Sequence, residues 1–254
     1  MTKLKILLVD DEKGFANIIA KRMVKRGLDV TKAYSGAEAL QAIRKADFDV
    51  AVLDLKMEDM DGIEILRTIK QETNLLLETE ILSTDHLDDL SKEVDLLRVG
   101  SRNMDNYELL KAVGRTNKPV ILKRNMSATL EEFLLAAEYI LSVGNNKVIL
   151  CERGIRTFEN YTRNTLDILA VPALKELTHL PVIVDPSHGI GIREMVPQMA
   201  LAGIAAGADG TIIEVHHEPD TAFSDGAQTI THQTMKELLS KIKAIAPILG
   251  RKLN

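Results

Sequence analysis

Basic side chains recur directly after short β-branched or leucine-rich runs in the second half of the chain. The segments VGSRN, VILKRN and VILCERG place four such residues after successive runs: Arg102, Lys123, Arg124 and Arg153. If the runs are parallel strands, their carboxyl ends meet at one edge, and the cations can converge on one dianion. One strand-end arginine alone is more typical of a surface ion pair, but the regular recurrence favours a phosphate site.

The next two runs end in residues that suit a metal ion. VDPSH and EVHHEP supply His188 and Glu214, and FSDG supplies Asp225. One imidazole with two carboxylates suits a borderline divalent ion such as manganese, iron, cobalt or zinc. His188 alone would more readily be structural. Beside the basic cluster, however, the set predicts a metal that activates a carbonyl near a phosphorylated substrate.

Acidic residues follow two apolar runs near the N-terminus. Asp10 and Asp11 end KILLVDD, and Asp54 ends VAVLD. Carboxylates at the ends of parallel strands suit a hard cation such as Mg²⁺, which would help Asp54 attack a phosphoryl donor. The alternative is that these acids only cap loops.

The elements that must position these residues alternate along the chain. Short apolar runs are followed by longer segments of helical spacing, which is typical of βα units on a parallel sheet, so the fold class is α/β. Helices are expected at 36–46 after Ser35, and at 129–143, where Ser127 or Thr129 precedes Glu131 and Glu132 as in a capping box. Nine strands are expected, at residues 5–10, 29–34, 49–55, 75–82, 95–100, 118–124, 147–152, 181–185 and 209–215.

Composition limits the class of protein. With 254 residues, 45% of them apolar, the chain can form one α/β barrel or two smaller domains. A net charge of −5 without a Lys/Arg block argues against nucleic acid or a membrane as the main partner. No stretch approaches the roughly 18 apolar residues of a membrane span. The single cysteine, Cys151, cannot form an internal disulfide, so we expect a cytoplasmic protein.

Residues 1–72 resemble the first three βα units of a response-regulator receiver domain. The resemblance rests on the acidic pair ending a strand, on Asp54 ending VAVLDLKM, and on MDG opening a helix. It implies a flavodoxin-like arrangement in which Asp54 is the phosphoacceptor. Asp10, Asp11 and the backbone carbonyl of Lys56 would hold Mg²⁺.

The receiver pattern does not continue beyond its third unit. A receiver next supplies a hydroxyl residue that ends strand four and a lysine that ends strand five. Thr79 instead lies inside its expected strand, and Arg98 lies only near the place of the lysine. Phosphorylation-dependent signalling is therefore an alternative, not the leading hypothesis.

Residues 75–247 resemble the type I-beta branch of the 3-deoxy-D-arabino-heptulosonate 7-phosphate (DAHP) synthases. The run CERGIRTFENYTRNTLDILAVP carries the resemblance, with GSRN, KPVILKR, DPSH, EVHHEP and SDGAQ in the same order. The related 3-deoxy-octulosonate 8-phosphate synthases share the barrel, but the TRNTLD continuation favours the DAHP branch. The implied fold is a (βα)8-like TIM barrel in which receiver-like units replace the first barrel units.

The resemblance implies a metal-dependent, aldol-type condensation of phosphoenolpyruvate with erythrose 4-phosphate, at the entry to aromatic amino-acid biosynthesis. The substrate-binding residues would be Arg102, Lys123, Arg124 and Arg153. The catalytic residues would be Lys123, Arg153 and His188, and the metal ligands His188, Glu214 and Asp225. Two further candidates for acid–base or supporting roles are Glu152 and Asp185, with packing or loop capping as the alternative.

Two motifs of a complete synthase do not occur in the sequence. A GPC motif would supply a cysteine metal ligand, and a KPRTS motif would supply a lysine and an arginine beside phosphoenolpyruvate. Cys151 matches the ordinary cysteine before Glu152, so it cannot replace the ligand. Asn125 stands where the family usually has glycine, and Ile192 stands where relatives are often basic. We therefore expect impaired catalysis.

The two fragments meet in a helix near residues 70–74 without a linker, so we expect 1–72 and 73–254 to form one merged domain. Receiver strands run in the order 2-1-3, whereas a barrel needs sequential neighbours. Three strands and six strands make nine, so the chain can close with nine, displace one, or keep an open sheet. We expect a barrel-like closure.

The leading hypothesis is a hybrid, DAHP synthase-like transferase with an incomplete site, produced by recombination or by engineering. One alternative is an active synthase whose site is completed by a partner chain in a homo-oligomer. The others are a non-catalytic scaffold that retains phosphate binding, and a signalling module phosphorylated at Asp54. In the leading hypothesis the partners are phosphorylated small molecules.

Overall fold

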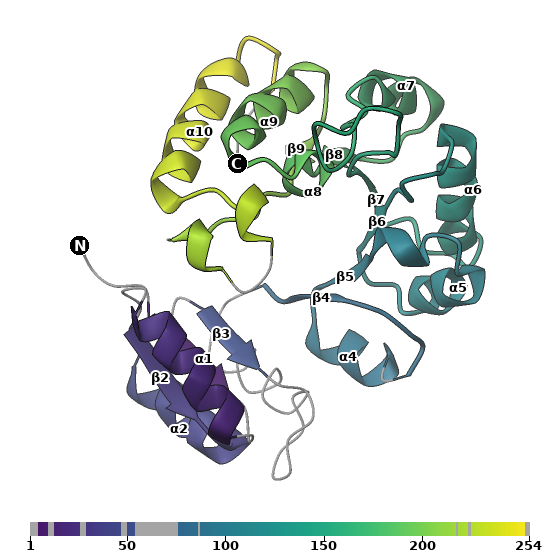
Figure 1. The fold of residues 1–254 in the computed structure, drawn as a ribbon. Coiled ribbons are helices and arrows are strands. Elements are labelled where there is room, and N and C mark those ends of the chain that lie inside the picture. Colours follow the sequence, from purple (N-terminus) through teal and green to yellow (C-terminus); the bar gives the residue numbers. More distant parts are fainter. Residues whose placement is uncertain are drawn as a thin grey trace. The chain divides into compact units, whose positions relative to one another are not determined.

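The computed structural model describes residues 5–9, 13–25, 29–46, 50–53, 76–85, 87–216, 218–222 and 225–251. The chain divides into two compact units, Met1–Leu77 with Asp89–Val94, and Glu78–Asp88 with Asp95–Asn254. Both units are α/β (Figure 1). The merger of the two fragments into one domain stays a prediction. No helix in the described part of the chain is long and apolar enough to cross a membrane.

The first unit contains a parallel sheet of three described strands in the order β2-β1-β3. Its elements are β1 (Lys5–Val9), α1 (Lys13–Lys25), β2 (Asp29–Ala33), α2 (Gly36–Lys45) and β3 (Val50–Leu53). Central strand β1 is apolar on both faces, as expected for a strand covered on both sides. Ile6 and Leu8 pack with alanines of α1, whereas Leu7 and Val9 pack with Ala39 of α2.

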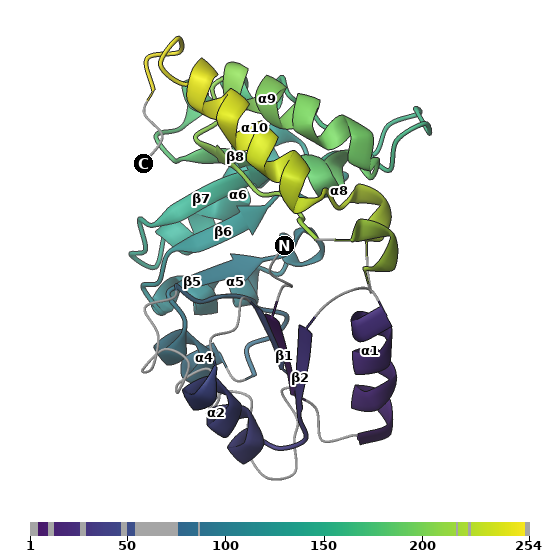
Figure 2. The same ribbon diagram turned by 90° about the vertical axis from the view of Figure 1, so that its left-hand side faces the viewer.

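The second unit contains a curled parallel sheet of six strands in sequential order from β4 to β9, which forms a half-barrel with helices outside it (Figures 1 and 2). Its strands are β4 (Glu78–Glu80), β5 (Leu96–Val99), β6 (Val120–Lys123), β7 (Val148–Glu152), β8 (Val182–Val184) and β9 (Gly210–Thr211). Its helices are α5 (Tyr107–Arg115), α6 (Leu130–Leu141), α7 (Ala170–Leu177), α8 (Pro186–Ile190), α9 (Val196–Ala205) and α10 (His232–Ile245), while α4 (Leu87–Glu93) is divided between the two units. Short 3₁₀ turns lie at Ser101–Asn103, Arg193–Met195, Pro219–Thr221 and Gly226–Gln228.

The pairing of these strands confirms the α/β class and the sequential, barrel-type strand order of the second unit. The described strands form two sheets, of three and six strands. Closure of the chain into one barrel of nine strands therefore stays a prediction.

Helix starts follow the capping signals of the sequence. Ser35 caps α2, because its Oγ accepts a hydrogen bond from the backbone N–H of Glu38 at 3.0 Å. Thr129, rather than Ser127, caps α6: the N–H of Glu132 donates to Thr129 Oγ1 at 3.1 Å, and the N–H of Thr129 donates to the Glu132 carboxylate at 2.8 Å. The capping box is therefore complete, and the loop after β6 ends at a fixed point.

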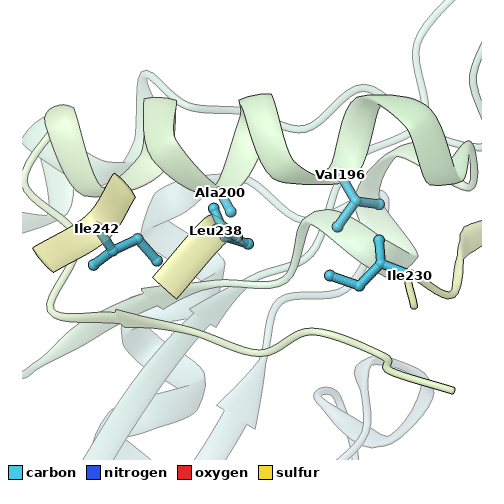
Figure 3. Close-up of a cluster of buried hydrophobic side chains, with 5 residues drawn as sticks. All are labelled: Val196, Ala200, Ile230, Leu238 and Ile242. Atoms are coloured by element: carbon cyan, nitrogen blue, oxygen red, sulfur yellow. The ribbon is translucent and has the colours of Figure 1, made fainter. Parts of the chain in front are cut away.

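A buried apolar cluster holds the last helices of the second unit against the chain that precedes α10. It consists of Val196, Ala200, Ile230, Leu238 and Ile242 (Figure 3). Ile230 also forms a parallel bridge with Val215, which follows β9. The cluster and the bridge fix the segment before Ile230 beside residues 214–216, and both segments contain predicted metal ligands.

Candidate active site

A cavity of about 270 Å³ lies at the carboxyl ends of the strands of the second unit. Charged residues and one histidine, from the strands and from the loops after them, line it: Glu80, Arg98, Arg102, Lys123, Arg153, Arg163, His188 and Asp225. Cations outnumber carboxylates in this lining, which favours an anionic ligand. The carboxyl ends of the strands are also where βα barrels place their chemistry.

Arg153 is buried in the cavity wall without complete hydrogen bonding. Its side chain follows β7, the residue is 5% exposed, and Nη1 has no hydrogen-bond partner among the described residues. Burial lowers the pKa of its guanidinium from the ordinary value. An unsatisfied buried donor costs about 1–3 kcal/mol, so it is unusual unless a ligand completes it. Exposed Arg102 lines the same cavity, so the two arginines can act on one anion.

Lys123 and Asp185 form a buried ion pair beside Arg153. Lys123 Nζ lies 2.7 Å from Asp185 Oδ2, and the two residues are 4% and 0% exposed. Burial alone would raise the pKa of Asp185, but His188 and Lys123 lower it to about 2. Asp185 also caps α8 by accepting from the N–H of His188 at 3.0 Å. These contacts favour a supporting or loop-capping role for Asp185 over an acid–base role.

The structure brings the three predicted metal ligands together. Ligand atoms of His188, Glu214 and Asp225 all lie within 4.8 Å of one another. His188 Nε2 faces Glu214 Oε1 at 3.1 Å, and Nδ1 lies 2.8 Å from Asp185 Oδ2, although without hydrogen-bond geometry. A carboxylate behind the imidazole of a ligand is a common supporting arrangement at metal sites. This donor set fits a borderline divalent ion.

Arg124 lies behind the cavity wall, although it follows Lys123 directly. Its Nη1 donates to Glu152 Oε2 and to Asp167 Oδ2, both at 2.9 Å, and its Nε donates to the carbonyl of Ala128. Arg124 is 4% exposed and is not among the residues that line the cavity. Its position does not support the predicted substrate contact, and it indicates a packing role instead.

Glu152 and Gly154 set the turn that carries Arg153. Glu152 is fully buried, burial raises the pKa of its carboxyl group, and its Oε1 accepts from the N–H of Gly154 at 2.6 Å. Gly154 has a φ of +92°, and a Cβ there would lie 2.8 Å from Asn164 Cβ and 2.9 Å from Gly189 Cα. Only glycine fits this turn. The structure therefore favours the packing alternative for Glu152.

The predicted acidic site of the first unit, made of Asp10, Asp11 and Asp54, lies outside the described residues. Thr79 and Arg98 lie in β4 and β5 and so belong to the six-stranded sheet, separate from the sheet of β1, β2 and β3. Arg98 pairs with Glu78 at 2.6 Å and with Glu80 at 3.4 Å.

Sequence reasoning did not assign three residues to this site or to its immediate surroundings. Arg98 lies within a strand rather than at its end, and Arg163 and Gln228 come from loops distant in sequence from the strand ends. Arg163 Nη1 nevertheless lies 2.9 Å from Asp225 Oδ1 and 2.7 Å from Gln228 Oε1. Both loop residues lie inside the motifs TRNTLD and SDGAQ, and that placement was the one available signal.

Comparison with known proteins identifies the family. The family model described as the DAHP synthetase I family matches residues 20–249. The chain belongs to this family. The match begins within α1, so it includes part of the first unit of this DAHP synthetase I family chain as well as the second.

Individual relatives of this DAHP synthetase I family chain carry two related names. The phospho-2-dehydro-3-deoxyheptonate aldolase of Thermotoga maritima is 49% identical over 193 residues, which are 76% of this chain and 57% of that relative. The 2-dehydro-3-deoxyphosphooctonate aldolase of Syntrophobacter fumaroxidans is 30% identical over 200 residues, 74% of this chain and 68% of that relative. The match thus spans little more than half the length of the first of these relatives.

Solved structures extend the likeness of the DAHP synthetase I family chain to nearly its whole length. A truncated form of 3-deoxy-D-arabino-heptulosonate 7-phosphate synthase from Thermotoga maritima aligns with 99% of this chain and 90% of its own, with a TM-score of 0.72 and 39% identity. The half-barrel therefore matches a TIM-barrel-like DAHP synthase. The receiver-like origin of residues 1–72 stays a prediction.

Proposed function

We propose that this chain binds phosphoenolpyruvate and erythrose 4-phosphate as a DAHP synthase-like transferase, and that their aldol-type condensation is impaired. The observation that carries the proposal is the buried, unsatisfied Nη1 of Arg153 in a cationic cavity beside His188, Glu214 and Asp225. Family membership supports the same substrates.

In this proposal Arg102, Lys123 and Arg153 bind the phosphate and carboxylate groups of phosphoenolpyruvate. Arg153 supplies a donor that is already desolvated, so the anion does not have to remove water from it. Lys123 is held by Asp185 at 2.7 Å, which fixes its ammonium group in the wall of the cavity. Arg102 is exposed, so it can move towards the ligand.

His188, Glu214 and Asp225 would hold the divalent ion, which is manganese, iron, cobalt or zinc by the chemistry of the donor set. When bound, such an ion polarises the aldehyde of erythrose 4-phosphate. Asp185 faces the second nitrogen of His188 and would keep the imidazole oriented.

We expect impaired catalysis because the sequence lacks groups that a complete synthase uses. The GPC and KPRTS motifs are absent, and with them a thiol ligand and two cations beside phosphoenolpyruvate. Cys151 does not replace that thiol, because it is 0% exposed within β7 and burial raises the pKa of its thiol. The cytoplasmic location and a homo-oligomeric state stay predictions.

The test is to purify the chain with Mn²⁺ and to follow loss of phosphoenolpyruvate with and without erythrose 4-phosphate. We expect phosphoenolpyruvate to bind in calorimetry without measurable turnover, because the anion site is present and the remaining groups are not. Turnover that requires both substrates would refute impairment. If that turnover per chain rises with protein concentration, a homo-oligomer completes the site. Absence of phosphoenolpyruvate binding would refute the assignment of the cavity.

We propose separately that residues 1–72 are receiver-like units that stand in place of the first barrel units, with Asp10, Asp11 and Asp54 as a candidate Mg²⁺ site. The order β2-β1-β3 supports this proposal, because it is the order of the first receiver strands and not that of successive barrel strands. A phosphoryl-accepting function is not expected from it, because Thr79 and Arg98 belong to the other sheet.

Incubation with acetyl phosphate and Mg²⁺ should therefore leave no stable phosphoaspartate. Intact-mass measurement before and after incubation, and again with Asp54→Asn, provides the check. A mass increase of one phosphoryl group that disappears in Asp54→Asn would contradict the expectation and support the signalling alternative.

A further inference from the structure

We propose that Gln228 is a positioning residue that holds the carboxylate of Glu214 in the candidate metal site. The proposal rests on the metal site proposed above. It assigns a role to a side chain that lies outside both the ligand set and the cavity lining.

The buried amide of Gln228 bridges two charged side chains. Gln228 is 2% exposed. Its Oε1 accepts a hydrogen bond from Arg163 Nη1 at 2.7 Å, and its Nε2 donates to Glu214 Oε2 at 2.7 Å. Both polar atoms of the amide are therefore satisfied by charged partners, which give the stronger class of hydrogen bond.

These partners fix the orientation of the amide. A guanidinium group only donates hydrogen bonds and a carboxylate only accepts them, so Oε1 must face Arg163 and Nε2 must face Glu214. A lysine at this position would have no acceptor for Arg163, and a glutamate would have no donor for Glu214. Among side chains of this length, the neutral amide is the one that satisfies both neighbours.

The bridge leaves one oxygen of Glu214 directed at the metal site. Oε2 is occupied by Gln228, while Oε1 faces His188 Nε2 at 3.1 Å. The backbone of Glu214 is fixed as well, because its N–H donates to Ser187 Oγ at 3.0 Å and its carbonyl accepts from the N–H of Ile230 at 3.0 Å. Ile230 is anchored in the apolar cluster of Figure 3, two residues after Gln228.

Arg163 extends the bridge to the second carboxylate of the site. Its Nη1 also lies 2.9 Å from Asp225 Oδ1, so Glu214, Gln228, Arg163 and Asp225 form a continuous chain of polar contacts. The guanidinium charge offsets part of the repulsion between the two carboxylates. The two carboxylate ligands therefore share one supporting network of polar contacts.

The test is a titration of the full chain with Mn²⁺ in the absence of substrates. The concentration of free Mn²⁺ is measured from its electron paramagnetic resonance signal. Gln228→Met keeps the length of the side chain but removes both hydrogen bonds, and we expect its Mn²⁺ Kd to rise by about 10-fold or more, as for other supporting residues of metal ligands. Gln233→Met is the matched control, because Gln233 is exposed on α10 and donates to Glu237 at 2.7 Å. We expect its Kd to equal that of the wild type.

A melting curve in excess chelator separates positioning from folding. Equal Tm values for Gln228→Met and the wild type, with weaker Mn²⁺ binding, would support the proposal. If Gln228→Met does not fold, Gln228→Asn keeps the amide but is too short for both partners, and it should also bind Mn²⁺ more weakly. Wild-type affinity in whichever of these variants folds would overturn the proposal and leave the metal site intact. A wild-type chain that binds Mn²⁺ no better than His188→Ala would refute the site itself and the role of Gln228 with it.

Discussion

Replacing Arg153 with methionine is expected to weaken binding of phosphoenolpyruvate by about 30-fold or more, which corresponds to a loss of ~2 kcal/mol. The guanidinium is 5% exposed and Nη1 lacks a partner, so a ligand anion gains a desolvated contact that methionine cannot provide. The same change should not lower the free energy of unfolding, because it removes an unsatisfied buried donor. Calorimetry with phosphoenolpyruvate and urea denaturation measure the two quantities.

Arg156→Met is the control for that prediction. Arg156 is exposed in the same loop, and the substitution makes the same change of charge. We expect its affinity for phosphoenolpyruvate to stay close to that of the wild type. An equal loss in both variants would show that overall charge, and not the buried guanidinium, governs binding. Unchanged affinity in Arg153→Met would remove Arg153 from the site.

Replacing Asp185 with asparagine is expected to lower the free energy of unfolding by about 3–5 kcal/mol, because one partner of a buried ion pair is removed while the other stays charged. Lys123 Nζ lies 2.7 Å from Asp185 Oδ2, and neither side chain is more than 5% exposed. Asparagine keeps the size of the side chain, so the lost charge is the main change. Urea denaturation at neutral pH gives the difference.

Asp220→Asn provides the comparison for a surface pair. Asp220 lies 2.7 Å from Arg193, a distance equal to that of the buried pair, but its side chain is 82% exposed. The expected loss is below about 1 kcal/mol. Adding Lys123→Met to Asp185→Asn should restore part of the stability, since the unpaired charge is then gone. A double variant no more stable than Asp185→Asn would argue against the ion pair as the cause.

Much of the candidate site could be predicted because the motifs stand at strand ends. In a parallel sheet, side chains that follow the strands meet at one edge whatever their separation in sequence. This rule alone brings Lys123, Arg153 and His188 into one cavity. The helix starts at Ser35 and Thr129 were predictable for a local reason, because a capping side chain bonds within its own first turn.

The remaining features depend on tertiary contacts that the positions of the strand ends do not predict. The strand expected at 209–215 is reduced to Gly210–Thr211. Pairing with β8 ends at Thr211, although the apolar residues that predicted the strand continue to Val215. Arg163 reaches Asp225 only because the loop from Ile155 to Thr165 folds back on itself through an antiparallel bridge. Arg124 looked equivalent to Lys123 in sequence, yet it follows the last residue of β6, and its guanidinium pairs with Glu152 and Asp167.

Two interactions hold the connection between β6 and α6. Arg124 donates a hydrogen bond to the carbonyl of Ala128 across the connection, and Thr129 forms the capping box that begins α6. The number of residues in this connection is therefore more constrained than the residue types that it contains. Exposed Ser127 can be exchanged without breaking either interaction, whereas a residue inserted between Arg124 and Ala128 would disrupt the bond between them. Among chains that share this cavity, residues 124–129 should vary in sequence at Ser127 and should contain no gaps.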